Sequence, residues 1–314
     1  MSIMITGGGG FIGSRVVKKL LERDHEVVCL EAGDLGRLGD AAGHDKLSVV
    51  RGDVTQADDV TAAIRQHDVK RIVHLAAVMS PLVEDEPHLA MRVNVMGATH
   101  VFEAARQLGL ERVVYASSIG VYGDQPEYGD VAVDEDAFLH PLTIYGHTKA
   151  INEAVAVRYG ELFGVGAHAL RPCSVFGHGR LVGRSAEVSR VISLAAVNGA
   201  VEALQAPEQS APMIYVDDVA ELFVRLAIAD DLRHPVYLSG GIEATLQEIV
   251  DIVRELLPNV DITFTDTPQT YPHVTRADGR RIAADLGYDL PPLKDRVRDH
   301  INEARRDAGM PEIG

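Results

Sequence analysis

Two groups of residues in this sequence have types and spacings that are typical of binding or catalytic sites. They are three glycines near the N-terminus and one tyrosine–lysine pair. Gly7, Gly10 and Gly13 have the spacing G-x-x-G-x-x-G. The first glycine permits a tight turn, the second lets a phosphate approach the backbone, and the third lets a helix pack closely on a strand. Tyr145 and Lys149 are four residues apart, so they share one face of a helix. The glycines therefore favour phosphate binding, and the pair places a phenol beside an ammonium group.

The glycines lie in a strand–turn–helix pattern. Residues 2–5 form a short apolar run, and apolar residues recur at helical spacing over residues 16–21. Phe11 and Ile12 lie within the turn itself. A pyrophosphate would lie at the helix N-terminus, where free N–H groups and the helix dipole favour negative charge. A glycine turn without a ligand is the alternative interpretation.

A second strand is predicted at residues 26–30, and Glu31 ends it. An acidic residue about 20 residues after the glycines is expected to bind the ribose hydroxyls of adenosine. This context favours a dinucleotide over an empty turn. Because a carboxylate repels a 2′-phosphate, Glu31 also favours NAD over NADP. Arg37 lies nearby in the sequence and could weaken that preference.

Composition excludes several classes of function. The chain has 314 residues, of which 46% are hydrophobic, and a formal net charge of −16. This charge argues against a nucleic-acid partner or an anionic membrane surface. Cys29 and Cys173 are far apart, so a disulfide framework is not expected and a reducing cytoplasm fits. The N-terminal apolar run is too short for a signal peptide, and no segment approaches the roughly 18 apolar residues of a membrane helix.

Strand and helix patterns alternate through the first half of the chain. Repeated β-α-β units imply an α/β fold with a Rossmann-type, doubly wound parallel sheet that binds ligands at the carboxyl ends of its strands. Strands are predicted at 47–50, 71–75, 112–116 and around Leu170, with helices at 58–66, 89–108 and 145–163 and a loop at 124–141.

The pattern loosens from Cys173 onward. We predict a helix at 185–198, a strand-to-helix unit at 213–220, a strand at 235–238, a helix at 245–257 and a final helix through Ala304. We expect an NAD-binding Rossmann domain of residues 1–172 plus 213–240. A smaller, partly discontinuous substrate-binding domain would contain residues 173–212 plus 241–314.

The motifs of this chain and their order along the sequence resemble those of the extended short-chain dehydrogenase/reductase family, also called the NAD-dependent epimerase/dehydratase family. The resemblance covers about residues 1–240, and the C-terminal part matches only in outline. The residues that carry it after the glycine motif are Glu31, Asp53-Val54, His74-Leu75-Ala76-Ala77, Asn94-Val95, Ser117-Ser118, Tyr145-x-x-x-Lys149, Arg171-Pro172 and Tyr215-Val216-Asp217-Asp218.

The resemblance implies a catalytic set of Ser118, Tyr145 and Lys149. Removing a hydride from a secondary alcohol requires a base for the hydroxyl proton, and a free phenol has a pKa of about 10. An ammonium group one helical turn away favours the phenolate. Ser118 would hold the substrate oxygen, and Lys149 would also bind the nicotinamide ribose. A solvated helix start is the alternative interpretation of Tyr145 and Lys149.

An NAD site follows from the strand ends and the resemblance together. Asp53 and Val54 would face the adenine, although packing against a helix explains such residues equally well. Asn94 would support the site or pack a helix. No His, Cys, Asp or Glu set has metal-ligand spacing, so no metal is expected. The expected cofactor residues are Gly7, Gly10, Phe11, Ile12, Gly13, Glu31, Asp53, Val54, Leu75, Ala76, Ala77, Asn94, Tyr145, Lys149 and Arg171.

Departures from the family patterns bear on the reaction. Sugar-nucleotide dehydratases carry Asp-Glu after the catalytic Ser/Thr, where this chain has Ile119 and Gly120, so water elimination is disfavoured. Sugar-nucleotide epimerases carry Asn where this chain has Ser174, and an arginine before the Val-x-Asp strand end, where residues 211–215 contain none. Arg180, Arg184 or Arg276 could replace that pyrophosphate contact.

Local resemblance favours the L-threonine 3-dehydrogenase branch, through Ser117-Ser118-Ile119, Pro212–Tyr215 and Leu75–Ser80. Residues 177–184 depart from that branch, so threonine itself is not favoured. The leading hypothesis is an NAD-dependent oxidoreductase acting on a secondary alcohol of a free sugar, sugar acid or hydroxy acid. The expected substrate residues are Ser80, Ser118, Ile119, Ser174, Arg180 and Arg184.

Two other functions remain open at this stage. The first is an NAD-dependent sugar-nucleotide epimerase that uses the same catalytic residues. The second is a protein that binds NAD without turnover, which the intact Ser118, Tyr145 and Lys149 disfavour. The family resemblance also implies a homodimer formed through the helices at 89–107 and 145–162. The sequence leaves the substrate, the stereochemistry and the physiological direction open.

Overall fold

A seven-stranded sheet forms the centre of the computed structural model, which describes residues 1–183 and 186–314. The strand order is β10-β6-β5-β4-β1-β2-β3, and every pairing is parallel. This arrangement confirms the predicted Rossmann-type sheet. The strands are β1 (Ser2–Thr6), β2 (Glu26–Glu31), β3 (Leu47–Arg51), β4 (Arg71–His74), β5 (Arg112–Ala116), β6 (Ala167–Arg171) and β10 (Val236–Leu238).

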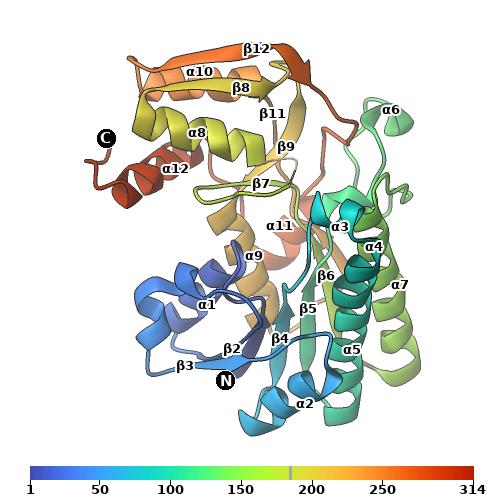
Figure 1. The fold of residues 1–314 in the computed structure, drawn as a ribbon. Helices are drawn as coiled ribbons and strands as arrows, with labels where there is room; N and C mark the ends of the chain where they lie inside the picture. Colours follow the sequence, from blue (N-terminus) through green and yellow to red (C-terminus); the bar gives the residue numbers. More distant parts are fainter. Residues whose placement is uncertain (184–185) are drawn as a thin grey trace.

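Both faces of the sheet are covered by helices (Figure 1). Ile3 and Ile5 of β1 belong to one hydrophobic core, whereas Met4 between them belongs to another. Alternate side chains of a strand point to opposite faces, so apolar residues at successive positions bury both faces of a parallel sheet. The first core contains α1 (Gly13–Glu22) and α9 (Val216–Ile228), and the second contains α2 (Ala57–Gln66), α5 (Gly97–Leu108) and α7 (Ile144–Phe163).

A smaller lobe lies over the carboxyl ends of the central strands, at the top of Figure 1. It contains a three-stranded sheet in the order β11-β9-β7 and a two-stranded sheet of β12 and β8. Its elements are β7 (Ser174–Phe176), α8 (Ala186–Asn198), β8 (Ala200–Gln205), β9 (Ser210–Tyr215), β11 (Ile242–Thr245), α10 (Leu246–Leu256), β12 (Asp261–Gln269) and α12 (Leu293–Asp307), whereas α11 (Arg280–Leu286) packs on β10 and α9.

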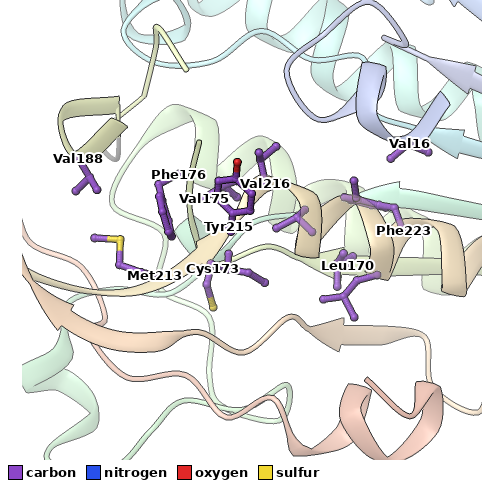
Figure 2. Packing of buried hydrophobic residues seen from close by; sticks show 14 of the residues in the cluster. Val16, Leu170, Cys173, Val175, Phe176, Val188, Met213, Tyr215, Val216 and Phe223 are labelled. Carbon is purple, nitrogen blue, oxygen red and sulfur yellow. The ribbon is translucent and has the colours of Figure 1, made fainter. Parts of the chain in front are cut away.

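The core of the first face continues into this lobe. Phe176, Val188, Met213 and Tyr215 lie close together in Figure 2, and they come from β7, α8 and β9. β9 pairs within the small sheet and not with the central one, although residues 213–215 belong to the predicted Rossmann domain. The division of the chain into two domains stays a prediction.

The predicted helix at 89–108 contains an unexpected π-helical segment. It consists of α4 (Pro87–Ala90), the π-helix η2 (Met91–Met96) and α5. Asn94 lies in η2, where its side chain accepts from the Val78 N–H at 2.8 Å and donates to the Val78 carbonyl at 3.0 Å. Asn152 of α7 donates to the Asn94 carbonyl at 2.8 Å. The bond to the Asn94 carbonyl competes with regular helical hydrogen bonding, and a sequence pattern does not reveal it.

The sequence pattern also missed short helices. The predicted loop at 124–141 contains α6 (Gln125–Tyr128), capped by a reciprocal pair of bonds between Asp124 and Glu127. A capping box at Thr245 confirms the start of the helix predicted at 245–257. No helix within the described residues is long and apolar enough to cross a membrane. The remaining elements are η1 (Gly36–Gly43), α3 (Leu82–Asp85) and η3 (Ile119–Val121).

Candidate active site

The glycine loop joins the end of β1 to the start of α1. Gly7 has φ +73°, which favours glycine, and a Cβ there would lie 2.8 Å from the backbone nitrogen of Ala76. A Cβ on Gly13 would lie 2.1 Å from the Gly7 carbonyl oxygen, so only glycine lets α1 begin so close to the strand. The Gly10 N–H donates to that same carbonyl at 3.0 Å. The loop therefore presents backbone to a ligand at the N-terminus of α1.

Glu31 lies at the edge of this loop. Its carboxylate accepts from the Gly9 N–H at 3.0 Å and from the Gly33 N–H at 2.9 Å. These two bonds fix the carboxylate at the end of β2, where the sequence predicts a ribose contact. Arg37 does not pair with Glu31. Its guanidinium donates to the Gly179 carbonyl at 2.7 Å, across the mouth of the cleft.

A cleft of about 690 Å³ begins at the glycine loop and reaches Ser118 and Lys149. Its lining fits a dinucleotide, because Gly7, Gly10 and Gly13 of the loop line the cleft at the N-terminus of α1, where backbone N–H groups can bind a phosphate. The structure brings most of the expected cofactor residues together here. Those that line the cleft are Gly7, Gly10, Phe11, Ile12, Gly13, Leu75, Ala77, Tyr145 and Lys149.

Other expected cofactor residues lie behind the cleft. The Asp53 carboxylate accepts from the Thr55 N–H at 2.9 Å, and Val54 is buried beside Gly97. The Ala76 N–H donates to the Thr6 hydroxyl at 3.3 Å. These contacts, like those of Asn94 to Val78, stabilise the strand ends around the cleft. They support the packing alternative for these residues.

Arg171 departs most from its expected role. Its guanidinium is 3% exposed and donates to both carboxylate oxygens of Glu153, at 2.8 and 2.6 Å. It also donates to the Tyr122 hydroxyl at 2.6 Å and to the Glu135 carbonyl at 3.2 Å. Because these bonds lie inside the protein, Arg171 stabilises the junction of β6 with α7, and its contacts do not support a cofactor role.

Ser118, Tyr145 and Lys149 converge at the inner end of the cleft. Thr143 caps α7 by accepting from the Gly146 N–H at 3.1 Å, which places Tyr145 in the first helical turn. Ser118 and Tyr145 line the same pocket, where Ser118 is the hydrogen-bonding neighbour that lowers the pKa of Tyr145. The Lys149 ammonium group donates to the Ala116 carbonyl at 2.8 Å and lies 5.4 Å from the centre of the Tyr145 ring.

Burial and Arg180 control the charge of this set. Burial raises the pKa of Tyr145, and the Arg180 guanidinium and the Ser118 hydrogen bond act in the opposite direction. Burial lowers the pKa of Lys149 to about 8, while the Glu153 carboxylate opposes that shift. The sequence predicts Lys149 as the cation that favours the phenolate. In the structure, the cation that lowers the Tyr145 pKa is Arg180.

A pocket of about 130 Å³ lies against Ser118 and Tyr145. Five of the six expected substrate residues line it, namely Ser80, Ser118, Ile119, Ser174 and Arg180. The sixth, Arg184, lies outside the described residues. Sequence reasoning missed further residues of its wall, which are Met79, Cys173, Tyr271, Pro272 and His273.

The Arg180 guanidinium is the charged group of this pocket. It lies 5.7 Å from the centre of the Phe11 ring, and its buried Nε atom has no hydrogen-bond partner among the residues that the structure describes. An unpaired buried donor is costly, so the position favours an acceptor supplied by a ligand. Outside residues 184–185, no group of three or more His, Cys, Asp or Glu side chains is placed to hold a metal ion.

The model of the NAD-dependent epimerase/dehydratase family matches residues 3–237 of the chain. The chain belongs to this family. The family description names NAD, which confirms the predicted cofactor.

The proteins that are similar to this chain differ in their activities. A UDP-glucose 4-epimerase of Mycolicibacterium smegmatis is 31% identical, over 79% of this chain and 80% of the relative. The structure of a Thermus thermophilus UDP-glucose 4-epimerase in complex with NAD has a TM-score of 0.83 and 26% identity, covering 97% of this chain and 99% of that one. An L-threonine dehydrogenase from Cupriavidus necator has a TM-score of 0.84 and 26% identity, covering 96% and 99%. The similarities therefore leave the substrate open.

Proposed function

We propose that this member of the family is an NAD-dependent dehydrogenase that oxidises a secondary alcohol of a small polar substrate, such as a free sugar, a sugar acid or a hydroxy acid. The observation that supports this proposal is the small pocket beside Tyr145, which the Arg180 guanidinium lines. A guanidinium suits a carboxylate or another polar acceptor of a small substrate. The homodimer expected from the sequence is part of the same proposal.

The catalytic residues act on the substrate hydroxyl group. Ser118 and Tyr145 hold its oxygen, and the Tyr145 phenolate takes its proton when the C–H bond breaks. NAD, when bound in the cleft, accepts the hydride. The Lys149 ammonium group, held by the Ala116 carbonyl, has further N–H groups that can bind the ribose at the inner end of the cleft. Arg180 lowers the pKa of Tyr145 and so favours the base form.

The contacts of the small lobe disfavour a nucleotide diphosphate. Ala211 and Met213 occupy the part of β9 where epimerases of the family have an arginine, and both are buried and apolar. Arg276 could have replaced that arginine, but it donates to the Glu243 carboxylate at 3.0 Å and to the Asp130 carbonyl at 3.1 Å. The remaining described candidate, Arg180, lies in the small pocket.

A sugar-nucleotide epimerase is the second candidate, and one observation favours it. A neighbouring cavity of about 570 Å³ shares Arg180, Gly183 and Tyr271 with the small pocket, so a longer substrate would have space beyond them. The 31% identity with a UDP-glucose 4-epimerase is consistent with that use. In this case the same residues would act, and the hydride would return to the opposite face of the ketosugar. A protein that binds NAD without turnover is disfavoured by the convergence of Ser118, Tyr145 and Lys149.

A screen with NAD and with NADP tests the proposal. Absorbance of the reduced nicotinamide would be followed with free sugars, uronic and aldonic acids, threonine, small hydroxy acids and sugar nucleotides. We expect net reduction of NAD by a free sugar or acid. We expect the Tyr145→Phe variant to bind NAD with unchanged affinity and to lose nearly all turnover. Substantial activity in that variant would contradict the assigned base, and conversion of a sugar nucleotide without net reduction would favour the epimerase.

A further inference from the structure

Tyr271 lies at the junction of the small pocket beside Tyr145 and the larger neighbouring cavity. We propose that Tyr271 determines substrate size, because its ring closes the small pocket against this outer cavity. The wild-type enzyme would then oxidise small substrates and discriminate against the same substrates with a glycosyl extension. This inference rests on the proposed function and specifies the size of its substrate.

The two cavities share three residues, and these differ in whether a side chain can separate one cavity from the other. Gly183 has no side chain. The Arg180 guanidinium lies between the Phe11 ring and Gly183, so it covers the side of the junction next to the cofactor loop. Of these three residues, Tyr271 therefore contributes the bulky group that can separate the cavities.

Both the backbone and the ring of Tyr271 have defined contacts. The Tyr271 N–H donates to the side-chain oxygen of Gln209 at 3.1 Å, and the Gln209 amide group donates to the Tyr271 carbonyl at 3.4 Å. The Tyr271 ring lies 5.0 Å from the His273 ring, measured between centres. Gln209 precedes β9, so the small lobe positions Tyr271.

The other side of this wall is positioned by the large lobe. The His273 N–H donates to the Asp124 carboxylate at 3.0 Å, and the Gln125 N–H donates to the His273 carbonyl at 3.2 Å. The Gln125 side-chain oxygen accepts from the N–H groups of Thr275 and Arg276, at 2.9 and 3.1 Å. Because both lobes hold this segment, Tyr271 belongs to a fixed wall.

The outer cavity determines which extension could enter once the wall is opened. Ser189, Ser193 and Gln269 line it with neutral polar groups. Apart from Arg180, which it shares with the small pocket, its charged described residues are Glu187 and Arg190, which are joined by two bonds at 2.7 and 2.8 Å. A neutral glycosyl unit matches such a lining, because hydroxyl groups can both donate and accept hydrogen bonds.

The test compares matched pairs of short and extended substrates. The pairs are glucose with cellobiose and gluconate with cellobionate, each assayed for NAD reduction. In the Tyr271→Ala variant we expect the kcat/KM ratio of extended to short substrate to rise by about tenfold or more, in the range of discrimination that packing in a pocket provides. The Tyr271→Phe variant keeps the ring, so we expect it to keep the wild-type ratio.

A second pair of variants tests the positioning of Tyr271. Gln209→Ala should change the ratio in the same direction by a smaller amount, through KM and not kcat. Gln247→Ala removes a glutamine side chain that donates to Asp251 within α10 and does not line either cavity, so we expect it to change nothing. Thermal melting of each variant checks that it is folded.

Each outcome separates this inference from the proposed function. If the wild type oxidises short substrates and Tyr271→Ala gains nothing on extended ones, the inference is wrong and the proposed function stands. A wild type that uses both members of a pair equally well also overturns the inference. If the wild type reduces no NAD with any short substrate, the proposed function fails. In that case a gain by Tyr271→Ala on extended substrates still supports the size barrier, and no gain contradicts it.

Discussion

Gly146 packs so closely on Gly120 that a Cβ at position 146 would lie 2.1 Å from the Gly120 carbonyl oxygen. This contact places the first turn of α7 on the η3 turn that follows Ser118. Tyr145 directly precedes Gly146, so the same contact keeps the phenol in the pocket that Ser118 lines. The geometry of the proposed catalytic set therefore depends on a missing side chain.

Replacing Gly146 should separate the proposed base from the substrate oxygen. In Gly146→Ala the first turn of α7 must move, and we expect kcat to fall by about 100-fold, as for a displacement of about 1 Å at a reacting group. Gly160→Ala is the matched control in the same helix, because its Cβ would meet its nearest neighbour at an ordinary 3.5 Å. Comparable kcat values for the two variants would show that the close contact has no catalytic role.

Removing the Arg180 charge should shift the pH dependence of oxidation. Arg180 lowers the pKa of Tyr145, so Arg180→Gln should raise that pKa. Tyr145 must lose its proton to act as the base, and the rising limb of the kcat profile should therefore move to higher pH. Arg180→Lys keeps the positive charge and should keep the limb closer to its wild-type position. An unchanged profile in Arg180→Gln would contradict the electrostatic role of this residue.

The buried pair of Glu153 and Arg171 should contribute strongly to stability. Both side chains are almost fully buried, and Glu153→Ala would leave an unpaired guanidinium inside the protein. We expect the free energy of unfolding to fall by about 3–5 kcal/mol. The control is Glu111→Ala, which removes an exposed carboxylate from its pair with Arg71 and should cost about 0–1 kcal/mol, because the Arg71 guanidinium keeps its bonds to the Ala227 and Ala229 carbonyls. Denaturant unfolding measures both values, and similar losses would contradict the role of the buried pair.

The exposed surface of α5 and α7 is the expected dimer interface. Ile151 and Val157 of α7 are 38% and 37% exposed, and Met96 beside α5 is 48% exposed. We predict a dimer, with twice the chain mass of 33.9 kDa in light scattering, and we expect Ile151→Asp to weaken it. Val131→Asp changes an exposed loop residue and should leave the mass unchanged. A wild-type mass of one chain would contradict the prediction.

Local patterns predicted the parts of the site that depend on local geometry. The glycine spacing determines a backbone path, and the spacing of Tyr145 and Lys149 places both side chains on one helix face. The alternation of strand and helix patterns along the chain predicted the central parallel sheet. Its strands are apolar because both faces of such a sheet are buried. The structure shows where the expected cofactor residues lie, but their contacts with NAD remain predictions.

Residues that depend on distant partners could not be predicted in this way. Arg171 is bound by Glu153 from another element, and no local pattern shows that its donors are already satisfied. Tyr271 is far in sequence from every motif, and its position depends on Gln209. Such contacts follow from the packing of the two lobes.

The number of NADH molecules released for each substrate molecule converted tests the central claim most directly. The amount of ketone product would be measured by chromatography beside the absorbance of NADH, with the best substrate from the screen. The proposed dehydrogenase predicts one NADH for each ketone formed. Conversion of a substrate to its epimer without NADH release would contradict it, because the hydride would then have returned to the substrate.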